Sequence, residues 1–400
     1  MRRSYFVFGG TGLLILAGAL FFRPAASADV PRVPSDQAEV LERLPLGASD
    51  PRERERERLR RILTVQPDDL ATAVALARLD IQLSRARSDP RYLSYAQAAL
   101  APWWDQPDAP TQVRVLRATI RQSVHDFEGA LVDLDRVVAT APGDAQAWIT
   151  RSVVLGVRGR YDEAKASCQP LQRLAPELVF TVCETSIDAV TGHAGAAYAR
   201  LAATIQRTPG LSPEENEWAL STLGEMAERL GHDADAERSF KAALAIDPDD
   251  AYVLAAYADL LLDLGRPLEA AKLVSARTEN DGLLLRLALA ERKAHAAEAS
   301  DHVALLGARF DASRLRGDTV HRREEARFEL GLRDDPRAAL SLARANWDVQ
   351  KEPWDVRVLL EAALAAGDAS AAAPALAFLD AHHLEDPRIS ALAARLRAPR

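Results

Sequence analysis

The two cysteines of the chain, Cys168 and Cys183, are the residues whose chemistry the sequence defines most sharply. They lie fifteen residues apart, on either side of an expected turn between two helices. In an oxidising compartment such a pair forms a disulfide bond when the geometry brings the two Cα atoms within about 7 Å. The alternative is a pair of buried thiols that serve as small apolar fillers. Two cysteines exclude a disulfide-dense scaffold and a multi-cysteine zinc fold.

The eight histidines show no metal-binding motif. They form neither an H-E-x-x-H motif nor a partner for a C-x-x-C motif. His321 and Glu325 are four residues apart and would share one face of a helix, but no further ligand has the spacing that a metal site needs. The sequence also lacks a G-x-S-x-G motif, a P-loop and a dinucleotide fingerprint in a strand–helix setting. We therefore expect no catalytic residues, no metal and no cofactor.

The first 28 residues have the layout of an export signal. Arg2 and Arg3 precede an apolar stretch over residues 5–22, and an A-x-A sequence follows at residues 26–28. This layout is typical of a secretory signal that is cleaved after Ala28. The alternative is an uncleaved membrane anchor, because the apolar stretch approaches the length of a spanning helix. In both cases we expect the rest of the chain in the periplasm, with membrane contact only through residues 5–22 if they are retained.

The composition predicts an all-α protein. The 400 residues include 76 alanines, and only 6% are aromatic. Alanine, arginine, glutamate and leucine favour helix, and the β-branched residues are too few for a large sheet, which excludes a β-sandwich or barrel. The net charge is -8, and removal of Arg2, Arg3 and Arg23 with the signal changes it to -11. A negative chain is not expected to bind nucleic acid through its phosphates.

A repeated spacing of small and apolar residues defines the helices. Pro142 and Pro176 each close one amphipathic helix and precede another, and they are 34 residues apart. Before each such proline, a small residue is followed by apolar residues four and seven positions later, and the proline comes five residues after that. Four copies have this spacing: Ala130, Leu134, Val137 and Pro142; Ala164, Cys168, Leu171 and Pro176; Ala197, Leu201, Thr204 and Pro209; Ala236, Phe240, Ala243 and Pro248.

This spacing resembles the tetratricopeptide repeat (TPR) family, whose unit of 34 residues forms a helix–turn–helix. The resemblance implies an all-α, right-handed α-solenoid of stacked helix–turn–helix hairpins. Small residues such as Gly224 and Ala236 are expected where two helices cross closely, with larger ones such as Phe240 beside them. Gly231 and Gly265 are expected to end first helices in the left-handed conformation.

The pattern divides the chain into four parts. They are a signal peptide or anchor, a linker with a charged helix, a TPR array, and divergent TPR-like hairpins with a C-terminal cap: residues 1–28, 29–66, 67–284 and 285–400. The charged helix is predicted to begin at Asp50-Pro51. Arginine and glutamate alternate over residues 52–58, and we expect them to form a solvated face.

The resemblance implies that ligands bind along the concave side, which the first helix of each hairpin lines. In this register seven residues form a candidate protein-binding groove: Trp218, Thr222, Glu225, Glu228, Tyr252, Asp259 and Asp263. Its carboxylates favour a basic or amphipathic segment as the ligand. The alternative is that these side chains only solvate or pack the groove.

The earlier repeats present a more apolar set at the equivalent positions. It would hold a partner helix or the chain's own terminal segment, and it consists of Gln112, Val115, Leu116, Thr119, Ile149, Val153, Val182 and Ser186. The Lys and Asn of the family's carboxylate clamp are absent from these inward positions.

Three functions remain open on this basis. The first is a non-catalytic periplasmic scaffold for protein–protein interaction, in envelope assembly or a secretion-linked complex. The second is a membrane-anchored subunit or assembly factor of an inner-membrane complex. The third is an enzyme with a site in the divergent region 285–330, which no motif supports. The expected partner is a protein or peptide and not nucleic acid.

Overall fold

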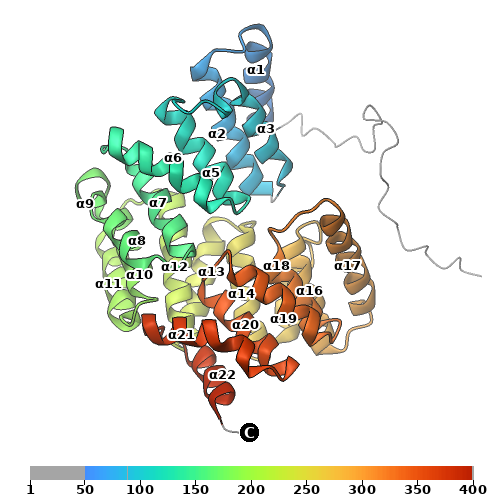
Figure 1. The fold of residues 1–400 in the computed structure, drawn as a ribbon. Coiled ribbons are helices and arrows are strands. Elements are labelled where there is room, and N and C mark those ends of the chain that lie inside the picture. Colours follow the sequence, from blue (N-terminus) through green and yellow to red (C-terminus); the bar gives the residue numbers. More distant parts are fainter. Residues whose placement is uncertain (1–49, 88, 399–400) are drawn as a thin grey trace, which may run out of the picture. The chain divides into compact units, whose positions relative to one another are not determined.

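Helices are the only regular elements in the described part of the chain, which covers residues 50–87 and 89–398 of the computed structural model (Figure 1). The predicted all-α solenoid is confirmed, because successive helices pack against each other as neighbouring pairs. Residues 1–49 lie outside the described part, and the predicted signal peptide or anchor and most of the linker fall there. Among the described residues, no helix has both the length and the apolarity needed to cross a bilayer.

The N-terminal half of the array consists of helix α1 and five hairpins. In chain order its helices are α1 (Pro51–Val65), α2 (Leu70–Arg87), α3 (Arg91–Ala99), α4 (Ala101–Trp104), α5 (Thr111–Ser123), α6 (Phe127–Thr140), α7 (Ala145–Val157), α8 (Tyr161–Cys168), α9 (Leu171–Leu174), α10 (Glu177–Asp188), α11 (Ala194–Arg207), α12 (Pro213–Arg229) and α13 (Asp233–Ile246). The helix starts follow the sequence signals, as at α12, where Ser212 and Glu215 form a capping box.

The C-terminal half contains four further hairpins and a last helix. Its elements are α14 (Ala251–Asp263), α15 (Pro267–Val274), α16 (Asp281–Ala294), α17 (Ala299–Leu315), α18 (Arg322–Gly331), α19 (Pro336–Trp347), α20 (Pro353–Ala366), the short 3-10 helix η1 (Ala369–Ala372), α21 (Ala373–His382) and α22 (Pro387–Arg397). As predicted, Gly231 and Gly265 adopt the left-handed conformation after α12 and α14, with φ of 73° and 69°.

The structure corrects two details of the predicted register. The predicted boundary between residues 284 and 285 falls inside α16, because the side chain of Asn280 caps this helix by accepting from the backbone N–H of Leu283 at 2.9 Å. The second helix that was expected to run through Cys168 and Leu171 is split into α8 and α9. Pro170 lies between the two and has no N–H with which to continue the hydrogen-bond ladder.

Helix α1 begins at Pro51, with Asp50 as its cap, as predicted, but its charged face is only partly solvated. Glu53 and Arg56 are buried against the next two helices. The Arg56 Nε donates to Asp80 of α2 at 2.5 Å, and the Tyr92 hydroxyl of α3 donates to Glu53 at 2.6 Å. The helix is therefore a packed part of the array and not a free linker.

Small residues lie at the closest crossing between α12 and α13. Gly224, Ala236 and the aromatic ring of Phe240 are all buried at this crossing. A Cβ atom added to Gly224 would lie 2.6 Å from Cε1 of Phe240. Only glycine lets the two helices approach this closely.

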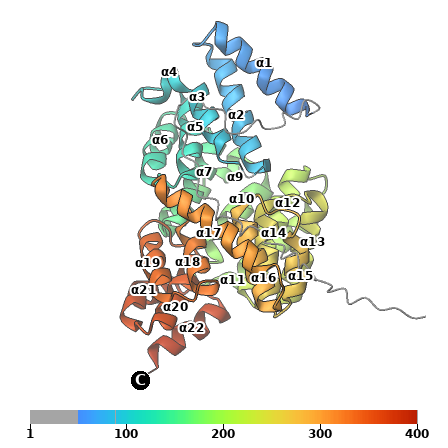
Figure 2. The same cartoon turned by 90° about the vertical axis from the view of Figure 1, so that its right-hand side faces the viewer.

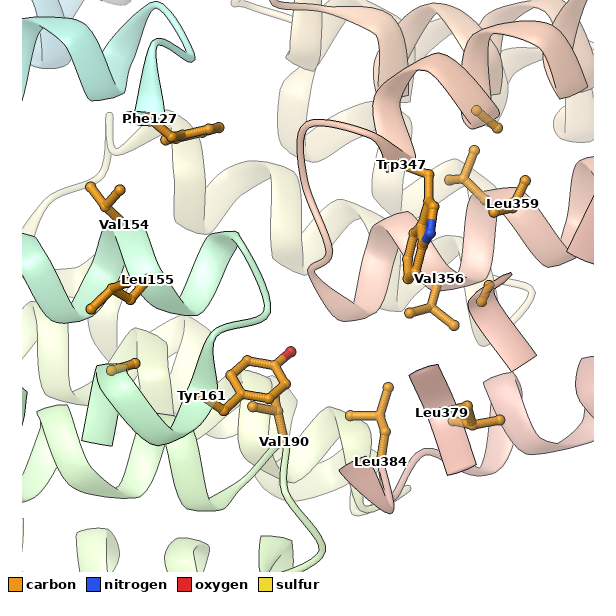
Figure 3. Packing of buried hydrophobic residues seen from close by; sticks show 14 of the residues in the cluster. Phe127, Val154, Leu155, Tyr161, Val190, Trp347, Val356, Leu359, Leu379 and Leu384 are labelled. Carbon is orange, nitrogen blue, oxygen red and sulfur yellow. The ribbon is translucent and has the colours of Figure 1, made fainter. Parts of the chain in front are cut away.

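The C-terminal hairpins pack back against the middle of the array (Figure 3). One hydrophobic cluster contains residues from α5 to α10 and residues from α18 to α22. Figure 3 shows Tyr161 of α8 on one side of this cluster, with Trp347 of α19 and Leu384, which follows α21, on the other. The ring of Tyr161 lies 4.8 Å from the ring of His382 in an edge-to-face arrangement.

Hydrogen bonds to backbone carbonyl groups join the same two regions. The Lys351 N–H donates to the Val157 carbonyl at 2.8 Å, and the Tyr161 hydroxyl donates to the Lys351 carbonyl at 3.3 Å. The Arg158 guanidinium donates to the Asp348 carbonyl at 2.9 Å. The array therefore closes on itself between α7–α8 and the loop before α20. Both views of the fold show the C-terminal helices beside the middle of the array (Figures 1 and 2).

A disulfide joins Cys168 at the end of α8 to Cys183 on α10, with the two Cα atoms 5.7 Å apart. We expect reduction of this bond to destabilise the protein by about 3 kcal/mol, because a 15-residue loop is then no longer constrained in the unfolded chain. Urea unfolding with and without dithiothreitol would measure this change. A variant with both cysteines replaced by alanine is the control and should not respond to the reductant. Two free thiols in the mass spectrum of unreduced protein would contradict the expectation.

Candidate binding cavity

The first helices of successive hairpins surround a cavity of about 550 Å³ on the concave side. Helices α7, α10, α12 and α14 line one part of it, and α16, α18 and the start of α20 line the remainder. The closure described above makes the cavity, because it brings α20 opposite α7. Cavities of 300–1,000 Å³ are typical of sites for small ligands or short segments of chain.

Part of the cavity lining is apolar, and the remainder is largely aromatic and charged. Ile149 and Val153 of α7 and Ile187 of α10 form the apolar wall. Trp218, Tyr252 and Trp354 contribute aromatic rings, from α12, α14 and α20 respectively. Tyr252 is 63% exposed and Val153 is 43% exposed, so both leave surface uncovered within the cavity.

The structure brings five of the seven predicted groove residues to this cavity. These five are Trp218, Thr222, Glu225, Tyr252 and Asp259. Glu228 lines a smaller neighbouring cavity of about 50 Å³. Asp263 forms ion pairs with Arg357 of α20 at 2.5 Å and with Arg388 of α22 at 3.3 Å. The seven residues therefore lie on one side of the array, but they do not form one continuous surface.

The predicted acidic character of the groove is wrong, because the chain neutralises its own carboxylates. Asp259 is buried and accepts from Arg286 of α16 at 2.7 Å and from Arg327 of α18 at 2.6 Å. Burial and the charges of Asp259 and Asp263 raise the pKa of Glu228 to about 8, so it is largely protonated at neutral pH. The groove therefore offers little negative charge to a basic ligand.

The predicted apolar stretch divides into core and cavity residues. Val115, Leu116 and Val182 are buried in hydrophobic clusters and face no ligand. Three others line the cavity, namely Ile149, Val153 and Ser186, whereas Gln112 and Thr119 do not line it. Of the two occupants considered for this stretch, the chain's own C-terminal part packs nearby, since Val115 belongs to the same cluster as Val356 and Leu359.

The repeat pattern did not predict several residues that line the cavity. Arg229 lies one helical turn after Glu225 on the same face of α12, and continuing the predicted face by four residues would have found it. Arg323, Glu324 and Trp354 come from α18 and α20, whose position opposite α12 has no signal in the repeat pattern.

An ion-pair network forms the C-terminal edge of the cavity. Arg323 donates to Glu352 at 2.9 Å, and Asn346 donates to the buried carboxylate of Asp355 at 2.7 Å. Burial opposes ionisation of Glu324, but the charges of Arg323 and other nearby cations outweigh it and lower the pKa of Glu324 to about 2. These groups satisfy one another and hold α18 beside the start of α20.

Among the described residues, no three or more His, Cys, Asp or Glu side chains are grouped so that they would hold a metal ion. His321 and Glu325, which share a helix face in the sequence, lie in different environments. His321 is exposed before α18, whereas Glu325 is buried and pairs with Arg314 of α17.

The hairpins and their stacking define the class of this protein as a TPR-like α-solenoid. No protein-family model and no curated protein sequence matches the chain. Solved structures that are similar to it include a tetratricopeptide repeat protein from Parabacteroides merdae, with 11% identity and a TM-score of 0.37 over 77% of this chain and 99% of that one. Human IFIT1, solved as a dimer with PPP-AAAA, has 12% identity and a TM-score of 0.43, and the match covers 88% of this chain and 96% of IFIT1. A chain of the Cut9–Hcn1 hetero-tetramer of the APC/C has 12% identity and a TM-score of 0.29, and the match covers 87% of this chain and 97% of that one.

Proposed function

We propose that this protein is an exported, non-catalytic helical-repeat scaffold that binds a segment of another protein in the cavity on its concave side. The observation that carries the proposal is the uncovered surface of Tyr252 and Val153 inside that cavity. Exposed apolar surface that lies in a concavity and is rimmed by polar groups is typical of an interaction site. The biological setting we propose is envelope assembly or a secretion-linked complex.

The cavity also limits the kind of partner segment. The C-terminal hairpins already occupy the side facing α7 and α8, and the remaining space is about 550 Å³. A short extended segment fits this space better than a whole helix, whose diameter with side chains is about 10–12 Å. We propose a protein partner and not nucleic acid, because the net charge of the chain is -8.

Photo-crosslinking from the cavity tests the proposal. The full chain would carry p-benzoylphenylalanine at Tyr252 and be exposed to light in envelope extract after nuclease treatment. The matched control carries the same group at Leu268, which is 72% exposed on α15 and does not line the cavity. We expect a defined protein adduct from position 252 only. No adduct, or the same adducts from both positions, would contradict the proposal.

Cleavage of the predicted export signal can be tested independently of the cavity. We propose that residues 1–28 are cleaved and that the mature protein is periplasmic, in line with the A-x-A sequence at residues 26–28. N-terminal sequencing of protein from the native envelope should then begin at Asp29. A start at Met1 would instead support the inner-membrane-anchored form.

A further inference from the structure

Arg229 is a cation in the cavity wall without a counter-ion. It lies in the last turn of α12 and lines both the main cavity and the smaller one beside it. Its Nε atom is buried and has no hydrogen-bond partner. No ion pair joins its guanidinium to another residue of the described part of the chain. Arg229 as a whole is half-buried, but a buried N–H donor without a partner, such as its Nε, is costly.

The other arginines that line the two cavities are all paired. Arg286 pairs with Asp259 at 2.7 Å, and Arg323 pairs with Glu352 at 2.9 Å. Two more are held by aspartates, Arg357 at 2.5 Å from Asp263 and Arg388 at 2.8 Å from Asp233. Arg229 therefore differs from every other arginine lining these cavities in the described structure.

The carboxyl group of Glu225 forms no hydrogen bond with Arg229. Glu225 lies one turn earlier on the same helix, but it accepts a hydrogen bond from the hydroxyl of Tyr252 and none from Arg229. Burial raises the pKa of Glu225 above its ordinary value, although the charge of Arg229 acts in the opposite direction. The N–H groups of Arg229 thus stay available to an anion that enters the cavity.

The surroundings of Arg229 define the rest of the ligand. The same cavity presents the apolar wall of Ile149, Val153 and Ile187, together with the rings of Trp218 and Trp354. A planar guanidinium accepts a carboxylate in a two-bond arrangement, and the apolar wall accepts a hydrocarbon body next to it. The cavity thus combines one anion-binding group with a larger apolar surface.

We propose that the cavity binds a ligand that carries a carboxylate on an apolar body, with Arg229 holding the carboxylate. This inference rests on the proposed function, because it uses the same cavity. The sequence favoured a basic ligand, whereas the cavity favours an acidic one. Two sources supply this chemistry: an acidic side chain within an apolar segment of a partner protein, or a free organic acid.

Calorimetric titration of the full chain tests both sources. The free-acid probes are decanoate and 3-phenylpropionate, with their amides as neutral controls. The peptide probe is a doubly blocked tetrapeptide with one glutamate among apolar residues, and its control has glutamine in place of glutamate. We expect the carboxylate form of at least one probe to bind about tenfold or more tightly than its neutral control.

Variants at Arg229 assign the effect to this side chain. Arg229→Gln should weaken carboxylate binding by about tenfold or more and remove the preference over the neutral probe, whereas Arg229→Lys should retain part of it. The matched control is Arg207→Gln, which changes the basic residue in the last turn of α11, outside the cavity. Melting temperatures show whether each variant is folded.

The outcomes separate this inference from the proposed function. Equal binding of carboxylate and neutral probes, or no loss of binding in Arg229→Gln, would overturn the inference. The crosslinker at position 252 can also be placed in the Arg229→Gln protein. If that protein still formed the same adduct, the proposed scaffold function would stand and the inference would fail. If a free acid bound through Arg229 but no adduct formed, the inference would stand and the proposed function would fail.

Discussion

Replacement of Asp259 by asparagine is expected to destabilise the protein by about 3–5 kcal/mol, because it leaves the buried Arg286 and the largely buried Arg327 without their counter-ion. Asp259 is only 2% exposed and lies between Arg286 and Arg327, at 2.7 Å and 2.6 Å. Arg327 is 68 residues away in sequence and comes from α18, so the variant should also loosen the C-terminal side of the cavity.

Urea unfolding followed by circular dichroism measures this effect. The matched control is Asp380→Asn, which removes an exposed pair with Arg397 and is expected to cost less than about 1 kcal/mol. Similar losses in the two variants would show that the buried pairs contribute no more than a surface pair does.

The effect of Asp259→Asn should depend on pH. Burial raises the pKa of Asp259, but the charges of Arg286 and Arg327 outweigh it and lower this pKa below its ordinary value. A carboxyl whose pKa is lowered in the folded state contributes stability above its unfolded pKa of about 3.9 and loses it as the pH falls. We therefore expect the stability difference between wild type and Asp259→Asn to be complete at pH 6–7 and to shrink below about pH 4.

Replacement of Phe240 by alanine is expected to cost about 3–5 kcal/mol, since this ring is fully buried between α12 and α14. The same ring should decide the effect of a change at Gly224. In the wild type, Gly224→Ala should destabilise the protein, because its Cβ would lie 2.6 Å from Cε1 of Phe240.

In the Phe240→Ala background the sign should reverse. The clash is then absent, and alanine is favoured over glycine within a helix by about 1 kcal/mol. A double-mutant cycle measured by thermal or urea unfolding gives this coupling. The control is Gly195→Ala in α11, where an added Cβ meets no atom within 4 Å. A destabilising Gly224→Ala in both backgrounds would contradict the proposed close crossing.

Local patterns predicted the hairpins but not their closure. The spacing that ends at Pro142, Pro176 and Pro248 reflects packing between neighbouring helices, so it is written into each repeat. The start of α16 was misplaced because its signal is the single capping residue Asn280 and no proline marks it. The contact between Val157 and Lys351 joins residues far apart in the chain and leaves no periodic trace.

For the candidate site, the positions of residues within one helix were predictable, but their contacts with distant helices were not. Trp218, Thr222 and Glu225 follow one another on a single face of α12, so the repeat register placed them on the concave side. Their electrostatic environment was not predictable, because Arg327, which pairs with Asp259, and Arg357, which pairs with Asp263, come from distant hairpins. The paired side chains are separated by 68 residues for Arg327 and by 94 for Arg357.

The closure between the middle and C-terminal hairpins also sets the order in which the chain completes its fold. In an open solenoid each repeat contacts only its neighbours, so folding can follow synthesis from the first repeat onward. Here the hydrophobic cluster that begins at Val115 includes Ile389 and Ala393. The central hairpins therefore lack part of their core until nearly the whole chain has been synthesised. Contacts of such long sequence separation slow folding, and until they form, the concave face remains open to other chains.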